Sequence, residues 1–267
     1  MSRVEKIADN VLALTDVVPI DGRLSWRPPK ARGFEPCNKY VVLSDERAML
    51  FDTGYAVHGE SLIASLREVV GSRKLFIFIT RIELECIGNL GRLLDTWPGT
   101  QVVTANVVPI LGLVHPRVRD AHPAAIHLQM GDTLADFGFP EVLINQGPIR
   151  MLGTSWPYER RSRTLMTTDF FGCDALERAV DSPLRTTSDG RPAPDAIYET
   201  LRCKFDWLDI AVMDSLLRDW RALFGATKPA AIAPIHGRIQ MGEALVRDVI
   251  EDYRRALFDR APTGRDT

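Results

Sequence analysis

The sequence predicts a mixed α/β sandwich, because short β-type runs alternate with a strongly amphipathic helix in the first half and the same theme returns in the second half. The chain has 267 residues, of which 45% are hydrophobic and 25% are charged. This length is sufficient for one large apolar core but short for two typical enzyme domains. A single domain over residues 1–267 is therefore expected.

The first half supplies most of the strand signals. Strands are predicted at 11–14, 39–43, 48–51 and 75–79. The polar stretch 44–47 separates the second of these strands from the third, so the two are expected to pair as a hairpin. Residues 60–70 have apolar side chains at helical spacing and are followed by Gly71, which predicts an amphipathic helix. A helix near 89–96 and a strand at 101–104 follow.

The second half repeats this pattern with longer helices. Strands are predicted at 142–145, 164–168 and 230–233, and helices at 196–205, 210–224 and about 242–258. The polar stretch 181–195, rich in Ser, Thr, Pro and Gly, is predicted to be a mobile loop or an insertion, and 259–267 a flexible tail. Three histidines at 115, 122 and 127 lack a regular ligand spacing, which favours a surface loop over 115–131.

Composition excludes several classes of function. A formal net charge of -2 gives no electrostatic basis for binding nucleic acid or an anionic membrane. The first ten residues lack the apolar region of a secretory signal, and no apolar run approaches the roughly 20 residues that span a bilayer. We therefore expect a cytoplasmic protein. The four cysteines form no C-x-x-C pair, so neither a zinc ribbon nor a disulfide scaffold is indicated.

Polar residues stand at the ends of two predicted strands, where α/β proteins assemble their sites. Asp52-Thr53-Gly54 follows one strand, and the segment 80–90 (TRIELECIGNL) follows the other. This second segment resembles the loop T-H-x-H/E-x-D-H-x-G of the metallo-β-lactamase superfamily. Further landmarks at 38–40, 168–172 and 233–237 agree with the superfamily in order and spacing. The resemblance implies a four-layer αββα sandwich.

Within the superfamily, the sequence looks most like the flavodiiron and oxygen-binding di-iron branch. Glu83 at the second loop position, the A-P-x-H-G ending at 233–237 and Tyr253 in the last predicted helix carry this likeness. That branch often has a flavodoxin domain after the last helix. The chain stops at Thr267 without a phosphate-binding loop there, so no flavin is expected.

The resemblance also assigns two metal positions, and the first has lost ligands. Its residues correspond to Arg81, Glu83, Arg150 and Asp169. A guanidinium has only hydrogen-bond donors and stays protonated, so two arginines should exclude a metal from this position. They could instead form a metal-free, buried ion-pair network with the nearby carboxylates.

The second metal position retains residues that can bind a metal. They correspond to Glu85, Cys86, Asp169 and His236, and Asp52 is expected to support the site. Carboxylate, thiolate and imidazole are all acceptable to zinc. The expected cofactor is therefore either none or one zinc or iron ion. Trp26, Phe34, Trp156 and Tyr158 are possible lining residues of an aromatic pocket, although core or interface positions are the more common use of such residues.

These departures favour a partner subunit over a self-sufficient enzyme. The leading hypothesis is a degenerate subunit of a heteromeric hydrolase, supporting a homologous catalytic subunit of the same fold that acts on a small molecule. It resembles the second subunit of a two-subunit aryl methyl ether hydrolase of the dinitroanisole O-demethylase kind. One alternative is a mononuclear zinc or iron metallohydrolase that uses the second position. Another is a di-iron-type sensor or reductase for oxygen or nitric oxide.

Overall fold

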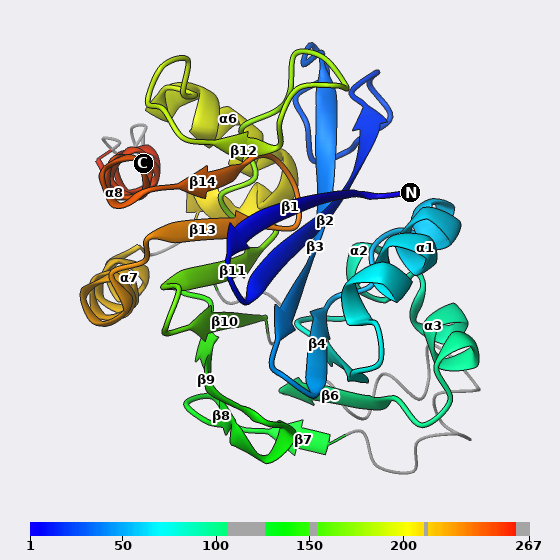
Figure 1. Cartoon of the computed structure of the whole chain (residues 1–267). Coiled ribbons are helices and arrows are strands. Elements are labelled where there is room, and N and C mark those ends of the chain that lie inside the picture. Colours follow the sequence, from blue (N-terminus) through cyan, green and yellow to red (C-terminus); the bar gives the residue numbers. More distant parts are fainter. Residues whose placement is uncertain (106–125, 150–153, 211–212, 260–267) are drawn as a thin grey trace.

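The computed structural model describes residues 1–105, 126–149, 154–210 and 213–259. Its first sheet contains seven strands that lie side by side in chain order (Figure 1). They are β1 (Arg3–Ala8), β2 (Val11–Pro19), β3 (Phe34–Leu43), β4 (Arg47–Phe51), β5 (Lys74–Ile79), β6 (Gln101–Ala105) and β7 (Ile126–Leu128). Strands β1 to β4 pair antiparallel, whereas β4 to β7 pair parallel.

The second sheet also has seven strands, in the order β12-β14-β13-β11-β10-β9-β8. Their bounds are β8 (Thr133–Leu134), β9 (Phe139–Gln146), β10 (Ser155–Glu159), β11 (Thr164–Thr168), β12 (Leu184–Arg185), β13 (Ala231–Pro234) and β14 (Ile239–Met241). The central pair β11 and β13 is parallel. Each sheet therefore has a parallel pair near its middle, β4 with β5 in the first and β11 with β13 in the second. The loops that follow the two strands of a parallel pair leave the sheet at the same end.

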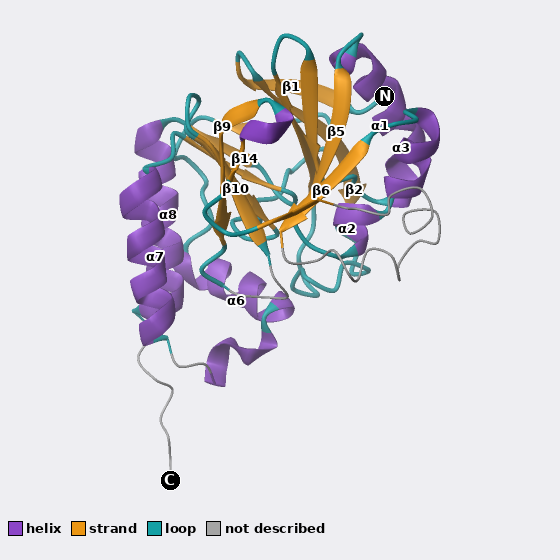
Figure 2. Cartoon of the chain, turned by 90° about the horizontal axis from the view of Figure 1, so that it is seen from below, coloured by secondary structure: helices purple, strands orange, loops and turns teal. Residues whose placement is uncertain are grey.

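Helices cover the outer face of each sheet. The first sheet is covered by α1 (Gly59–Val70), α2 (Leu84–Ile87) and α3 (Leu90–Thr96), and the second by α6 (Pro194–Lys204), α7 (Asp214–Thr227) and α8 (Glu243–Phe258). Figure 2 shows α7 and α8 on one side of the two sheets and α1 and α3 on the other. Short 3-10 turns lie at Ala56–His58, Ala135–Phe137 and Asp206–Ile210. The predicted four-layer αββα sandwich is confirmed.

Alternating side chains of single strands explain why these layers form. In β4, Met49 and Phe51 point into the core between the sheets, where they pack in the same cluster as Met166 of β11. Leu50 points the other way and packs with Leu66 of α1. Because successive side chains of a strand face opposite sides, one apolar strand can serve two layers.

A third apolar layer lies under the helices of the second sheet. Trp156 of β10 belongs to the same cluster as Leu201 of α6, Trp220 of α7 and Val246 of α8. Trp156 and Tyr158, considered above as pocket residues, are buried in this cluster. They therefore serve the core and do not line an open site.

Most predicted elements lie within a few residues of their observed bounds. The helix predicted from residue 210 begins at Asp214, and the stretch 181–195 contains the short strand β12 and is therefore not wholly loop. Most of 115–131 and the tail 260–267 lie outside the described residues. Across the described ranges, none of the helices combines the length and apolar character needed to cross a membrane.

Candidate functional site

The ends of four strands bring the predicted site residues to one edge of the sandwich. Asp52 follows β4 and Thr80 follows the parallel neighbour β5, whereas Asp169 follows β11 and His236 comes shortly after its parallel neighbour β13. Asn38 joins the two sheets here, because its side-chain amide donates to the carbonyls of Pro234 at 2.8 Å and Gly237 at 2.9 Å. The carboxyl ends of both parallel pairs therefore converge.

Asp52 anchors the loop that carries the next site residues. Its carboxylate accepts hydrogen bonds from the backbone N–H of Thr80 at 2.9 Å and from the Thr80 hydroxyl at 2.7 Å. Burial raises the pKa of Asp52 to about 7, although the two Thr80 donors act in the opposite direction. The residue expected to support a metal site thus fixes the start of the loop 80–89.

An ion-pair cluster occupies this edge, and Arg81 is its centre. The Arg81 guanidinium is 1% exposed and donates to Asp169 at 2.6 Å, to Glu83 at 2.9 Å and to Glu85. All three carboxylates were expected near a metal. A single guanidinium bridges them instead, with charge-assisted hydrogen bonds of the strong kind.

Lys204 supplies a second cation that the sequence did not reveal. Its ammonium lies 2.9 Å from Asp169 Oδ2 and 3.4 Å from Glu85 Oε1, and its side chain is 15% exposed. It comes from the last turn of α6, where a lysine ordinarily interacts with the negative end of the helix dipole. We define the ion-pair cluster as Arg81, Glu83, Glu85, Asp169 and Lys204.

The electrostatics of the cluster follow from this arrangement. Burial alone would raise the pKa of Asp169, but Arg81 and Lys204 hold it below its usual value. Glu85 likewise has a lowered pKa despite its burial, because His236, Arg81 and Lys204 favour its ionised form. Burial raises the pKa of the half-buried Glu83 to about 6, against the effect of Arg81. Glu85 and Asp169 are therefore ionised at neutral pH.

His236 lies beside the cluster among aromatic rings. Its Nε2 is 3.7 Å from Glu85 Oε1, and neither ring nitrogen has a hydrogen-bond partner among the described residues. The Trp26 ring stacks on the imidazole at a centroid distance of 4.8 Å, and the Tyr55 ring at 6.0 Å. The Lys204 ammonium lies 5.7 Å from the centre of the Trp26 ring. Trp26 therefore contacts both His236 and the cluster.

Two predicted site residues remain, Cys86 and Arg150. The Cys86 side chain is fully buried in the apolar layer between the first sheet and its helices, with its sulfur 3.9 Å from the Thr80 hydroxyl. Burial raises the pKa of this thiol well above its usual value, which disfavours the thiolate that binds metals. Arg150 lies outside the described residues.

The residues at this edge fit a metal ion poorly. Within the described ranges, no group of three or more His, Cys, Asp and Glu side chains is arranged to hold a metal. Glu85 and Asp169 each contact both Arg81 and Lys204, so these two cations bridge the two carboxylates. A metal at this point would have to displace the Lys204 ammonium or the Arg81 guanidinium.

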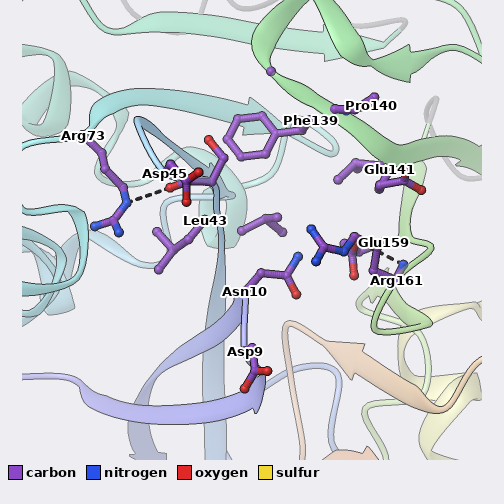
Figure 3. A pocket seen from close by; sticks show the side chains of 14 residues that line it. Asp9, Asn10, Leu43, Asp45, Arg73, Phe139, Pro140, Glu141, Glu159 and Arg161 are labelled. Atoms are coloured by element: carbon purple, nitrogen blue, oxygen red, sulfur yellow. Dashed lines mark hydrogen bonds between the residues drawn. The ribbon is translucent and has the colours of Figure 1, made fainter.

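A separate pocket of about 610 Å³ lies near the starts of β4 and β5, whereas the ion-pair cluster lies near the ends of these strands. Figure 3 shows the side chains that line this pocket. Asp45 and Arg73 line it near the starts of β4 and β5, and Arg161 lines it before β11. Its buried carboxylate Glu159 accepts backbone hydrogen bonds from Arg161 and Ser162. Among the described residues, no lining group of this pocket is both buried and without a hydrogen-bond partner. It does not belong to the cluster.

Comparison of the whole fold with solved structures gives clear matches. Rubredoxin:oxygen oxidoreductase from Desulfovibrio gigas matches 94% of this chain with a TM-score of 0.70 and 20% identity. The Flv1 flavodiiron core from Synechocystis sp. matches 96% with a TM-score of 0.69 and 18% identity. A metallo-β-lactamase from Pontibacter korlensis matches 94% of this chain and 100% of its own, with a TM-score of 0.58 and 15% identity.

The chain has the metallo-β-lactamase fold. Its higher TM-scores with the first two structures confirm, at the level of fold, the predicted likeness to the flavodiiron branch. The chain spans 60% of the length of each of those two chains. No protein-family model matches the sequence, and no curated protein matches it either. The metallo-β-lactamase fold is thus established by three-dimensional structure.

Proposed function

We propose that this chain is a non-catalytic, supporting subunit of a heteromeric hydrolase built on the metallo-β-lactamase fold. Its partner would be a homologous subunit that keeps its metal ligands. Aryl methyl ethers are the substrate class to assay first, on the basis of the sequence resemblance. The isolated chain would bind no metal at the cluster and no flavin.

The observation that carries this proposal is the position of the two cations. Arg81 contacts Asp169, Glu83 and Glu85, and Lys204 contacts Asp169 and Glu85. A metallohydrolase needs an ion that acts as Lewis acid and lowers the pKa of a bound water. Guanidinium and ammonium groups neutralise carboxylates but leave no open coordination position for such a water. Under this proposal, the two cations neutralise the carboxylates but do not supply the Lewis acid that activates a water.

The surrounding fold supports a structural role, because the loops remain well anchored. Thr80 is held by Asp52, and Asn89 donates from its side chain to the carbonyls of Thr53 and Tyr55, each at 2.8 Å. These hydrogen bonds hold the loops in place without a metal ion. A folded scaffold whose site has altered chemistry suits a subunit that works through an interface.

A mononuclear enzyme is the alternative against which the proposal must be tested. Such an enzyme would use Glu85, Cys86, Asp169 and His236. It is favoured by the two ring nitrogens of His236, which have no hydrogen-bond partner among the described residues. Against it, the Cys86 thiol faces an apolar layer, and the Lys204 ammonium stands between Glu85 and Asp169.

Metal analysis of the purified chain separates these possibilities. The chain is expressed in medium with added zinc and iron, and metal content is measured by mass spectrometry. We expect well below one ion per chain. The double variant Arg81→His/Lys204→Ala removes both cations and adds an imidazole, so we expect its zinc content to rise. Lys6→Ala, which removes an exposed lysine paired only with Asp9, is the matched control. One tightly bound ion in the unaltered chain would contradict the proposal.

The subunit assignment is tested by co-expression with a homologue of the same fold encoded nearby. We expect the two chains to co-purify as one complex whose hydrolytic activity toward an aryl methyl ether exceeds that of either chain alone. If the isolated chain hydrolysed the substrate as fast as the mixture, it would be an enzyme in its own right.

A further inference from the structure

An apolar pocket adjoins the ion-pair cluster on its outer side. Its volume is about 600 Å³, and its walls come from the end of β2, the following loop, the 3-10 turn at Ala56–His58 and the first residue of α2. Leu84, which lines it, stands between the cluster residues Glu83 and Glu85. Trp26 and Tyr55 also line it, and both stack on His236. The pocket therefore shares residues and neighbours with the site described above.

We propose that this pocket binds an uncharged, flat, aromatic small molecule. This inference goes beyond the subunit role, because it assigns a ligand to this chain itself. A volume of about 600 Å³ lies within the range of small-molecule sites, which are concave, mostly apolar and have few polar groups. A partner protein would need a wider surface than one pocket of this size.

Charge in the pocket indicates an uncharged ligand. Among the described residues that line it, Asp21 and Arg23 are the charged ones, and they pair with each other through hydrogen bonds of 2.8 and 2.9 Å. Each thus has a partner of opposite sign already. An ionic ligand would lose its hydration in this apolar surrounding without gaining a free counter-charge, which is unfavourable.

Ring geometry indicates that the ligand is flat. The planes of Trp26 and Tyr55 differ by only 9°, with centroids 6.2 Å apart, so the two rings that line the pocket have nearly parallel faces. Aromatic molecules favour offset stacking on such surfaces.

Two exposed apolar side chains mark the rim of the pocket. Val57 is 80% exposed and Leu84 is 72% exposed, although both are large and apolar. Covering such side chains yields roughly 25 cal/mol for each Å² of apolar surface removed from water. A ligand that stacks on the Trp26 and Tyr55 rings and extends to the rim would cover these two side chains and gain this free energy.

The test measures binding of three probes to the isolated chain by titration calorimetry at neutral pH. 2-Naphthol is flat and uncharged, 2-decalol is uncharged but not flat, and 2-naphthoate is flat but anionic. We expect saturable 1:1 binding of 2-naphthol, with each of the other probes weaker by about tenfold, a difference of about 1.4 kcal/mol. The assay contains no catalytic partner, so its failure would leave the subunit proposal intact.

Matched variants locate the binding. Val57→Asp places a charge at the rim of the pocket, whereas Val180→Asp changes a valine that is similarly exposed, at 75%, and is not among the lining residues. Because both residues are exposed, both variants should fold, which thermal unfolding would verify. We expect only Val57→Asp to weaken 2-naphthol binding, by about tenfold. Absence of saturable binding, or equal effects of the two variants, would overturn the proposal. So would self-association abolished by Val57→Asp without any probe binding, because the pocket would then be a protein interface.

Discussion

Two buried arginines in this protein have opposite surroundings. Arg27 forms a bidentate pair with a single carboxylate, Glu35, and also donates to the carbonyls of Cys173 at 2.8 Å and Gly172 at 2.7 Å. We call Arg27 and Glu35 the brace. Arg81, in contrast, is shared among three carboxylates, and its Nε has no hydrogen-bond partner in the part of the chain that the structure describes.

The difference separates a one-to-one ion pair from a cluster in which carboxylates share their cations. In the brace, one positive charge meets one negative charge, and two neutral backbone carbonyls accept further hydrogen bonds from the guanidinium. This is what a buried pair needs in order to offset its desolvation. In the ion-pair cluster, three carboxylates face two cations among the described residues, beside a histidine without a hydrogen-bond partner there. Carboxylates gathered around shared cations resemble the acidic groups that surround a bound metal ion more than they resemble a one-to-one ion pair.

Removing one partner of the brace should have the largest effect on stability. Glu35→Ala leaves the buried guanidinium of Arg27 without its counter-charge, so we expect a loss of about 3–5 kcal/mol in the free energy of unfolding. Urea denaturation measures this loss. The control Glu251→Ala removes a carboxylate that pairs with Arg254 at the surface and should cost less than about 1 kcal/mol. Equal losses in the two variants would show that the brace contributes no more than a surface pair.

Asp52 allows the pH dependence of the loop anchor to be separated from that of the cluster. Its folded-state pKa of about 7 lies above its ordinary value of 3.8, so the folded protein binds more protons than the unfolded chain between these values. Stability should therefore fall as pH rises from about 4 to 7. Asp52→Asn keeps hydrogen bonding to Thr80 but cannot ionise.

Between pH 4 and 7, we expect the free energy of unfolding of the unaltered chain to fall by about 2–4 kcal/mol because of Asp52, and we expect this fall to be absent in Asp52→Asn. Urea unfolding at each pH measures it. Glu83→Gln is the comparison, because the pKa of Glu83 is raised only to about 6 and its contribution ends earlier. The lowered pKa values of Glu85 and Asp169 act in the opposite direction, and their stabilisation is lost only below about pH 4. An unchanged pH profile in Asp52→Asn would mean that Asp52 is ionised throughout.

Much of the fold could be predicted because it depends on local patterns. The continuous apolar run of β4 and the helical spacing of Leu62 and Leu66 are visible in the sequence, and each is typical of the layers that these side chains join. Strands β1 and β10 were missed, since Arg3–Ala8 contains several charges and Ser155–Glu159 contains a proline. Edge position permits the first, and neighbours on both sides stabilise the second.

The site was only partly predictable, because two of its features depend on contacts between distant segments. Arg81, Glu83, Glu85, Asp169 and His236 converge as their positions at strand ends implied. Lys204 was missed because it is 119 residues from Glu85 in the chain, and a lysine at a helix end carries no signal of its partner. Cys86 occupies an expected ligand position, but the helical turn of α2 directs it into an apolar layer. Spacing gives the position of a side chain along the chain but not its direction.

Lys204 should show the smallest of the three effects. Lys204→Met removes the ammonium but keeps a long apolar stem against Trp26, while Arg81 still contacts both Glu85 and Asp169. Because Arg81 remains and Lys204 is partly exposed, we expect a loss of only about 1–2 kcal/mol in urea unfolding. Lys204→Arg keeps the positive charge and should recover most of that loss. If Lys204→Met instead stabilised the protein, the ammonium would cost more in desolvation than its two carboxylate contacts return. Among the described residues, Arg81 would then be the cation whose contacts with Glu83, Glu85 and Asp169 stabilise the cluster.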